Sequence, residues 1–107
     1  MILICKQIIP EGYSGLTLYP FIFLKEACQK NNAILLNHEQ IHLAQQKELF
    51  IVFFYALYVI EFLIRLVVYK NWSTAYRNIS FEREAYGNEA NLVYIKKRPR
   101  WAFFNFI

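Results

Sequence analysis

The sequence contains no aspartate, only two cysteines, two histidines, three glycines and three prolines, and 19% of its 107 residues are charged. This shortage of charge excludes an intrinsically disordered chain, because disorder depends on a polar, charge-rich composition. The cysteines, Cys5 and Cys28, lack C-x-x-C spacing. Without that spacing, neither a zinc knuckle nor a redox pair is indicated, and we expect both thiols to be reduced.

Hydrophobic residues make up 57% of the chain, and ten Phe, eight Tyr and two Trp bring the aromatic share to 19%. The length suits one domain and excludes a large multi-pocket enzyme. A core of this size does not easily bury so much apolar surface. A membrane surface or a partner, such as a second copy of the chain, therefore competes with a self-contained core for this apolar surface, and composition alone does not choose between them.

The net charge of +4 is concentrated near the C-terminus, where a basic cluster from Lys96 to Arg100 precedes the aromatic residues 101–107. This tail suits a membrane interface or a basic turn before a segment packed on the core. Nucleic acid is not an expected partner, because no Gly-rich or RNP-like motif accompanies the cluster. No secretory signal is recognised, so we expect a location on the cytoplasmic side, with membrane association left open.

The expected fold class is mainly α (α+β). Stretches Ile2–Ile9 and Leu16–Leu24 are rich in β-forming residues and flank a turn at Glu11–Gly15, with Pro20 marking an edge or bend. Asn31 and Asn32 can cap a helix that starts near Ala33. The single domain 1–107 is therefore divided into a β-hairpin or edge-strand region (1–30), a motif helix (33–48), a hydrophobic helical segment (49–69), a second helix (80–95, capped by Ser80) and a basic, aromatic tail (96–107).

The motif helix carries H-E-x-x-H, formed by His38, Glu39 and His42, which includes both histidines of the chain. Histidines four residues apart lie about 40° from each other on a helix, so both can bind one zinc ion. Zinc lowers the pKa of a bound water to about 7, and Glu39 is placed to take its proton as general base. A catalytic zinc needs a third protein ligand. The composition leaves a glutamate, Cys5 or Cys28 for that position.

A second motif, Phe81-Glu82-Arg83-Glu84-Ala85-Tyr86, opens the helix at 80–95. With H-E-x-x-H it resembles the gluzincin metallopeptidases, in which the Glu of an E-x-x-A-D type motif on a following helix completes the site. The resemblance covers about 37–46, including Gln45 and Gln46 after the second His, and 76–86. It implies that Glu82 is the third ligand, with Glu84 and Glu89 as fallbacks, and that Ala85 lets the two helices approach closely.

Tyr86 stands where the larger membrane-bound relatives carry an Asp that orients a metal-binding histidine. By this resemblance Tyr86, Glu84 or Asn37 takes over the orienting role, or metal affinity is weakened. A tyrosine beside zinc could instead donate to the developing oxyanion, and Tyr86 and Tyr76 are the candidates. Glu39 and Tyr86 are therefore the expected catalytic residues.

The resemblance implies a minimal zincin-like domain acting as a zinc metalloendopeptidase on a peptide or protein substrate. The strand at Leu16–Leu24 would align extended substrate or only pack the core, and the tail could also occupy the cleft. The alternative is a non-catalytic, membrane-associated or oligomeric protein with a structural or vestigial zinc site.

The hydrophobic segment 49–69 is interrupted only by Glu61 and Arg65, which are spaced to pair on one helix face. If Glu82 shares an ion with His38 and His42, both ends of the segment lie on one side of any bilayer, which excludes a single span. A straight helix from His42 to Tyr69 would rise about 40 Å, too far for the residues before Glu82 to return unless fully extended. We therefore expect a break within or shortly after 50–65 and a buried, interfacial or re-entrant helical hairpin.

Overall fold

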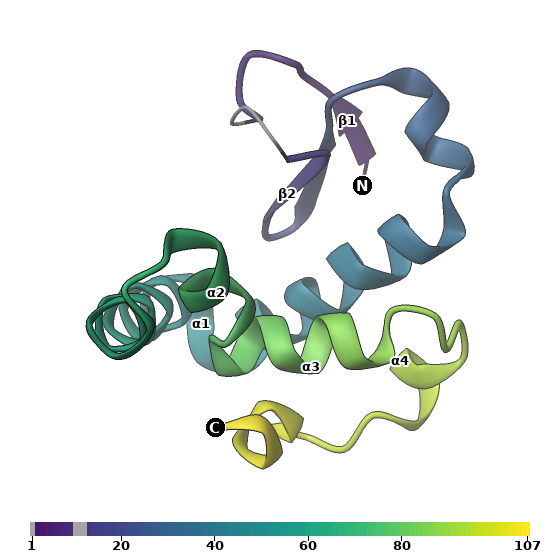
Figure 1. The fold of residues 1–107 in the computed structure, drawn as a ribbon. Helices are drawn as coiled ribbons and strands as arrows, with labels where there is room; N and C mark the ends of the chain where they lie inside the picture. Colours follow the sequence, from purple (N-terminus) through teal and green to yellow (C-terminus); the bar gives the residue numbers. More distant parts are fainter. Residues whose placement is uncertain (1, 10–12) are drawn as a thin grey trace.

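The computed structural model describes residues 2–9 and 13–107, so part of the expected turn at Glu11–Gly15 lies outside the described residues. The described chain is mainly α-helical with a small three-stranded mixed sheet at its N-terminal end (Figure 1). This confirms the expected mainly α class. The elements in order are β1 (Ile2–Ile4), β2 (Gly15–Leu18), β3 (Phe21–Leu24), the 3-10 helix η1 (Ala27–Asn31), α1 (Ala33–Tyr69), α2 (Trp72–Arg77), α3 (Ser80–Asn88), α4 (Tyr94–Lys97) and the 3-10 helix η2 (Ala102–Phe106).

The sheet has the strand order β1-β3-β2, with β1 parallel and β2 antiparallel to β3. The bend expected at Pro20 is confirmed by a turn at Tyr19–Pro20. Leu16–Leu24 is therefore not one strand, because its two halves pair with each other as the hairpin β2–β3. The strand predicted over Ile2–Ile9 is also too long. The Cys5 N–H donates to the carbonyl of Leu24. Pairing stops at this point because Leu24 is the last residue of β3.

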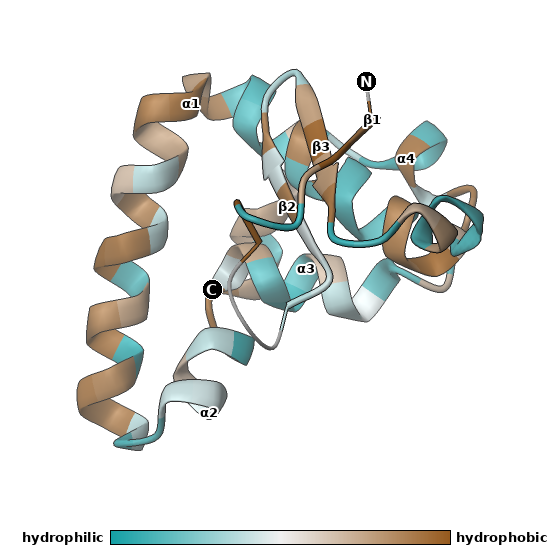
Figure 2. Ribbon diagram, turned by 90° about the horizontal axis from the view of Figure 1, so that it is seen from above, coloured by the Kyte–Doolittle hydropathy of each residue, from teal (hydrophilic) through white to brown (hydrophobic). Residues whose placement is uncertain are grey.

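α1 begins as predicted, with the Asn32 side chain accepting a hydrogen bond from the Leu35 N–H. Its path breaks at Phe50 (φ 52°, ψ 122°), the first position of the predicted interval. The helix then continues to Tyr69, and the hairpin turn lies at Lys70–Asn71, later than expected, with α2 folding back beside α1 (Figure 2). The kink aims the second half of α1 so that Phe54 packs on Phe81 of α3.

α3 is shorter than the helix predicted over 80–95. It ends at Asn88 because the Asn37 amide of α1 donates to the carbonyls of Asn88, Glu89 and Asn91, which satisfies the end of the helix. Ser80 is the first helical residue and not the cap. The prediction of Ser80 as cap is therefore wrong.

The capping role at α3 belongs to Glu61 on α1. Its carboxylate accepts the Ser80 backbone N–H at 3.0 Å and the Ser80 hydroxyl at 2.6 Å. A negative charge at a helix N-terminus also interacts favourably with the helix dipole. The predicted pairing of Glu61 with Arg65 is absent from the ion pairs of residues 2–9 and 13–107.

The core lies where α1, α3 and the C-terminal segment meet, and its buried members are Leu49, Phe54, Ile79, Phe81 and Phe103. Phe103 belongs to η2, so the C-terminal tail packs on the core. This is the second of the two arrangements predicted for it, a basic turn before a packed segment. Arg98 of the basic cluster is also fixed, in ion pairs with Glu48 and Glu84. Trp101, Phe104 and Ile107 stay exposed.

Replacing Glu61 with alanine should lower the free energy of unfolding by about 1–2 kcal/mol, because α3 loses its cap and a charged hydrogen-bond acceptor. Chemical denaturation measures this change. Arg65→Ala is the control and should cost about 0.5 kcal/mol or less. An equal loss in the two variants would show that the Glu61–Arg65 pair, and not the cap, stabilises the protein.

Candidate metal centre and adjoining cavity

The fold brings His38 and His42 of α1 against Glu82 of α3, as the sequence predicted, and these residues form a group that could hold a metal ion. The Nε2 atoms of the two histidines lie 3.2 Å apart, and Glu82 Oε1 lies 3.3 Å from His38 Nε2 and 3.2 Å from His42 Nε2. Ligand atoms about 2.0–2.1 Å from a tetrahedral zinc ion are separated by about 3.3–3.4 Å. The spacing of the three atoms therefore fits a single tetrahedral metal ion of the size of zinc.

The group is buried, with 5%, 6% and 3% of His38, His42 and Glu82 exposed. Burial alone lowers the pKa of His42, but the charge and hydrogen bond of Glu82 outweigh it and raise the pKa to about 9. Burial alone raises the pKa of Glu82, yet His42 and His38 hold that pKa well below its usual range. Without a bound ion, the site is thus a buried imidazolium–carboxylate pair at neutral pH.

Each ligand is oriented by another side chain. His38 Nδ1 lies 3.0 Å from Glu89 Oε2, and His42 Nδ1 lies 2.8 Å from Gln45 Oε1. The amide oxygen of Gln45 can only accept, so His42 donates from Nδ1. Loss of the Nε2 proton would then leave the Nε2 lone pair facing the metal position. The Tyr58 hydroxyl donates to Glu82 Oε2 at 2.6 Å, leaving Oε1 toward the histidines.

The histidine-orienting role predicted for Tyr86, Glu84 or Asn37 therefore lies with Glu89 and Gln45. Glu89, a fallback ligand in the sequence analysis, acts on the far nitrogen of His38. Asn37 instead binds the end of α3. Neither cysteine joins the metal-binding group found among the described residues.

Glu84, the other fallback ligand, holds the Gln45 side chain by a hydrogen bond on the side away from His42. The Gln45 amide donates to Glu84 Oε1 and to the Phe81 carbonyl, both at 3.0 Å. Glu84 is fully buried and is also bound by Tyr94 and Arg98, and Arg98 makes two further hydrogen bonds to Glu48. The C-terminal segment therefore helps to hold the amide that orients His42.

Tyr86 contacts the site through its ring. The ring lies edge-on against His38, with centroids 4.5 Å apart, and the Arg77 guanidinium lies 3.8 Å from its centroid. Its hydroxyl donates to the Tyr76 hydroxyl at 3.5 Å. The catalytic role predicted for Tyr86 remains a prediction, whereas Tyr76 is among the residues that line the cavity beside the metal group. Ala85 is fully buried on α3, as a close approach of the two helices requires.

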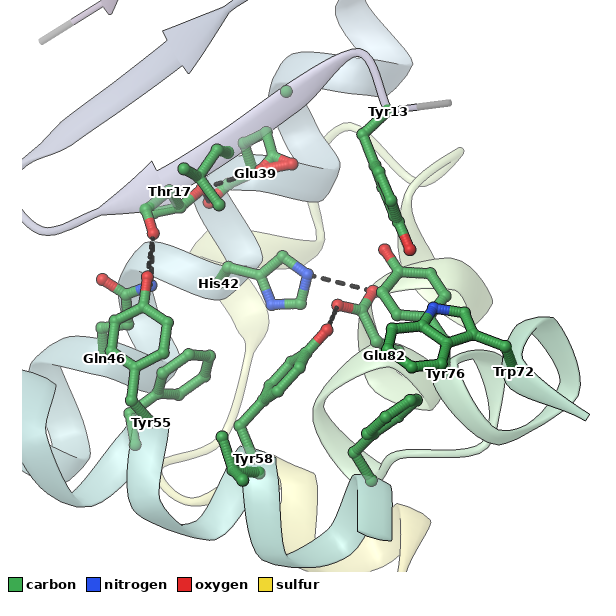
Figure 3. A pocket seen from close by; sticks show the side chains of 15 residues that line it. Tyr13, Thr17, Glu39, His42, Gln46, Tyr55, Tyr58, Trp72, Tyr76 and Glu82 are labelled. Carbon is green, nitrogen blue, oxygen red and sulfur yellow. Dashed lines mark hydrogen bonds and ion pairs between the residues drawn. The ribbon is translucent and has the colours of Figure 1, made fainter. Parts of the chain in front are cut away.

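A cavity of about 440 Å³ adjoins the metal group, between β2, the second half of α1 and α2 (Figure 3). His42, Glu82 and Glu39 supply its charged groups. The rest of the wall is mostly apolar, and its aromatic members are Tyr13, Phe54, Tyr55, Tyr58, Phe62, Trp72 and Tyr76.

Glu39 lies on the β2 side of the cavity. Its carboxylate accepts a hydrogen bond from the Thr17 hydroxyl at 2.8 Å, and it is only 5% exposed. Gly15 makes room for it, because a Cβ at Gly15 would lie 3.3 Å from Glu39 Cδ and crowd the carboxylate. β2 thus holds the predicted general base in place.

Tyr58, Thr17 and the orienting roles of Gln45 and Glu89 were not predicted from the sequence. Gln45 had a local signal, because it stands three residues after His42 on the same helix face. Thr17 and Tyr58 had none, since their places depend on the sheet and on the kink at Phe50.

No protein-family model, no curated protein and no solved structure matches the chain. The evidence for the site is therefore its own geometry.

Gln45→Leu should weaken zinc binding by about 10–100-fold, because it removes the acceptor that orients His42. Competition with a chromophoric chelator measures the affinity. Gln46→Leu is the matched control: Gln46 binds Tyr19 and Thr17, so the variant loses comparable hydrogen bonds but none to a ligand. Equal affinities for the Gln45 variant and the control would contradict the orienting role.

Zinc binding at pH 7 should release about one proton, because a pKa of about 9 keeps His42 protonated and the ion needs its Nε2 lone pair. The release should vanish above about pH 9. Calorimetry in buffers of different ionisation enthalpy measures it, and zinc uptake without proton release at pH 7 would contradict the ion pair.

The same shifts give the metal-free protein a pH-dependent stability. The raised pKa of His42 contributes stability fully below 6.5, and this is lost as the pH rises through about 9. The lowered pKa of Glu82 contributes stability above 4.5, and this is lost as the pH falls. In the presence of a chelator, the free energy of unfolding should therefore be greatest between about pH 4.5 and pH 6.5.

Proposed function

We propose that this protein is a zinc-dependent peptidase in which His38, His42 and Glu82 hold the metal and Glu39 acts as general base. The observation that carries the proposal is a three-ligand group with zinc spacing that lies directly beside a cavity containing a buried carboxylate. The gluzincin resemblance of the H-E-x-x-H and E-x-x-A motifs supports the same assignment.

The number of ligands favours a catalytic over a structural site. Structural zinc sites are usually closed by four protein ligands, whereas catalytic sites use three and leave a position for water or substrate. The metal group of the described residues has three members, and His42 and Glu82 also line the cavity. A substrate in the cavity could therefore reach the metal position.

When bound, zinc would supply a Lewis acid that polarises the peptide carbonyl and acidifies the attacking water. Glu39 takes the proton of that water and can return it to the leaving amine, a role that needs a carboxylate held within hydrogen-bond reach. Thr17 fixes the carboxylate by donating to it, and Gly15 leaves the space that it occupies.

Tyr76 is the better placed of the two predicted oxyanion donors, because it lines the cavity. Its hydroxyl lies 3.5 Å from the hydroxyl of Tyr86. Burial, reinforced by the charge of Glu82, raises its pKa well above the usual range. Tyr76 therefore stays protonated at neutral pH and can donate to a developing oxyanion.

The wall of the cavity favours peptides with a large apolar side chain, because an aromatic-lined pocket recognises apolar groups. Backbone pairing with an extended substrate is restricted along β2. The Thr17 carbonyl points away from β3 and already accepts hydrogen bonds from Gln46 and Tyr55. The backbone of Gly15, beside Glu39, is therefore the position of β2 at which an extended substrate can pair.

The full-length protein should carry about one zinc ion per chain, and His42→Ala should lose it. Glu39→Gln should keep the metal but cleave peptides at least about 100-fold more slowly, because the general base is lost. Glu26→Gln, at an exposed glutamate, is the matched control and should cleave normally. Elemental analysis gives the metal content, and a library of peptides with large apolar side chains gives the activity.

Two outcomes would contradict the proposal. Wild-type protein that binds no zinc would remove the metal site itself. Zinc retained without cleavage of any library member would instead favour the structural or vestigial site of a non-catalytic protein.

A further inference from the structure

In the second half of α1 the exposed side chains are apolar and the polar ones are half-buried, which is the reverse of a helix in a water-soluble protein. All ten exposed residues between Val52 and Val68 are apolar, and we call them the outer face. The polar side chains of the same segment, Tyr55, Tyr58, Glu61 and Arg65, occupy half-buried positions. In a water-soluble helix the exposed side is the polar one. The outer face therefore suits contact with an apolar partner.

The second half of α1 runs along one side of the molecule (Figure 2). By length and composition alone α1 could cross a membrane, a property that core helices and signal sequences share. A core helix would be mostly buried, but only 6% of the most apolar 18-residue stretch of α1 is buried. The opposite side of this segment packs on α2 and on Ser80 and Phe81 of α3. One half of the helix is thus covered by protein and the other half is uncovered.

The breadth of the outer face favours lipid over a second copy of the chain. At 100° per residue, the ten positions cover about 180° of the helix surface, whereas a helix–helix seam needs a narrower stripe. The face is about 24 Å long and carries no charge. An amphipathic helix lying in a bilayer interface has these properties.

The ends of the outer face are basic. Exposed Lys47 precedes it, and exposed Lys70 and Trp72 follow it. Lysine reaches from an apolar helix face to anionic headgroups, and tryptophan prefers the headgroup level. The net charge of +4 has the same sign. The charges flanking the face therefore complement an anionic lipid surface.

The outer face is continuous with the cavity. Val59 and Trp72 line the cavity and are also 51% and 64% exposed, so they lie at its rim. A bilayer against the outer face would lie beside this rim and could deliver an apolar ligand to it.

We infer that the outer face of α1 docks on the surface of an anionic lipid bilayer and places the rim of the cavity at that surface. The metal group lies on the inner side of α1 and is not part of the contact.

Flotation of the full chain with vesicles of phosphatidylcholine and phosphatidylglycerol tests this inference. Wild type should float with the vesicles, and the double variant Ile60→Glu/Ile64→Glu should bind at least tenfold less. Ile8→Glu/Leu92→Glu is the matched control, since it adds the same charge at residues that are 44% and 57% exposed, against 53% and 55% for Ile60 and Ile64. Circular dichroism and zinc content report whether each variant is folded.

Wild-type protein that does not float would overturn the inference, as would an equal loss in the control. A lipid-free dimer that Ile60→Glu/Ile64→Glu dissociates, without vesicle binding, would assign the face to a second copy. These readouts do not depend on catalysis. A chain that floats but cleaves no peptide would therefore contradict the proposed function and leave the docking surface in place.

Discussion

The paths of α1, α2 and α3 bring several polar groups around one buried charge, the Glu82 carboxylate. A buried charge is costly unless it is paired and hydrogen-bonded. Glu82 is 3% exposed, and its two oxygens are satisfied by the histidines of α1 and by Tyr58. These partners come from both halves of α1, on either side of the kink at Phe50. The kink and the return of the chain through α2 are what allow all of them to reach one carboxylate.

Polar groups accordingly form much of the interior beside the site. The buried residues of the first half of α1 include Asn37, Gln45 and Gln46, together with the H-E-x-x-H residues. In the described part of the chain, no buried side-chain nitrogen or oxygen lacks a hydrogen-bond partner. A satisfied polar network of this kind holds the ligands in a single geometry, which a purely apolar core would not do. In the second half of α1, by contrast, Phe54 is buried, whereas ten apolar residues between Val52 and Val68 are exposed.

Local patterns predicted several elements because the interactions concerned are local. The cap at Asn32 depends on residues within one turn of the helix start, and the pairing of His38 with His42 depends only on helical periodicity. The strand boundaries were wrong because a strand ends where its partner ends, and the partner of β1 lies about twenty residues away. Ser80 had the chemistry of a cap, but its cap is Glu61, nineteen positions earlier in the chain.

Composition and helical periodicity alone place two histidines one turn apart with a glutamate between them, and they leave a glutamate, Cys5 or Cys28 for the third ligand position. Helical geometry is enough to place the first three residues together. The contacts between elements add what composition and periodicity leave open: Glu82 is the glutamate that lies beside the two histidines, Glu89 and Gln45 contact their far nitrogens, and Thr17 holds Glu39. Each of those contacts joins separate elements, apart from the one made by Gln45, and therefore depends on the direction that α1 takes after Phe50 and on the position of β2.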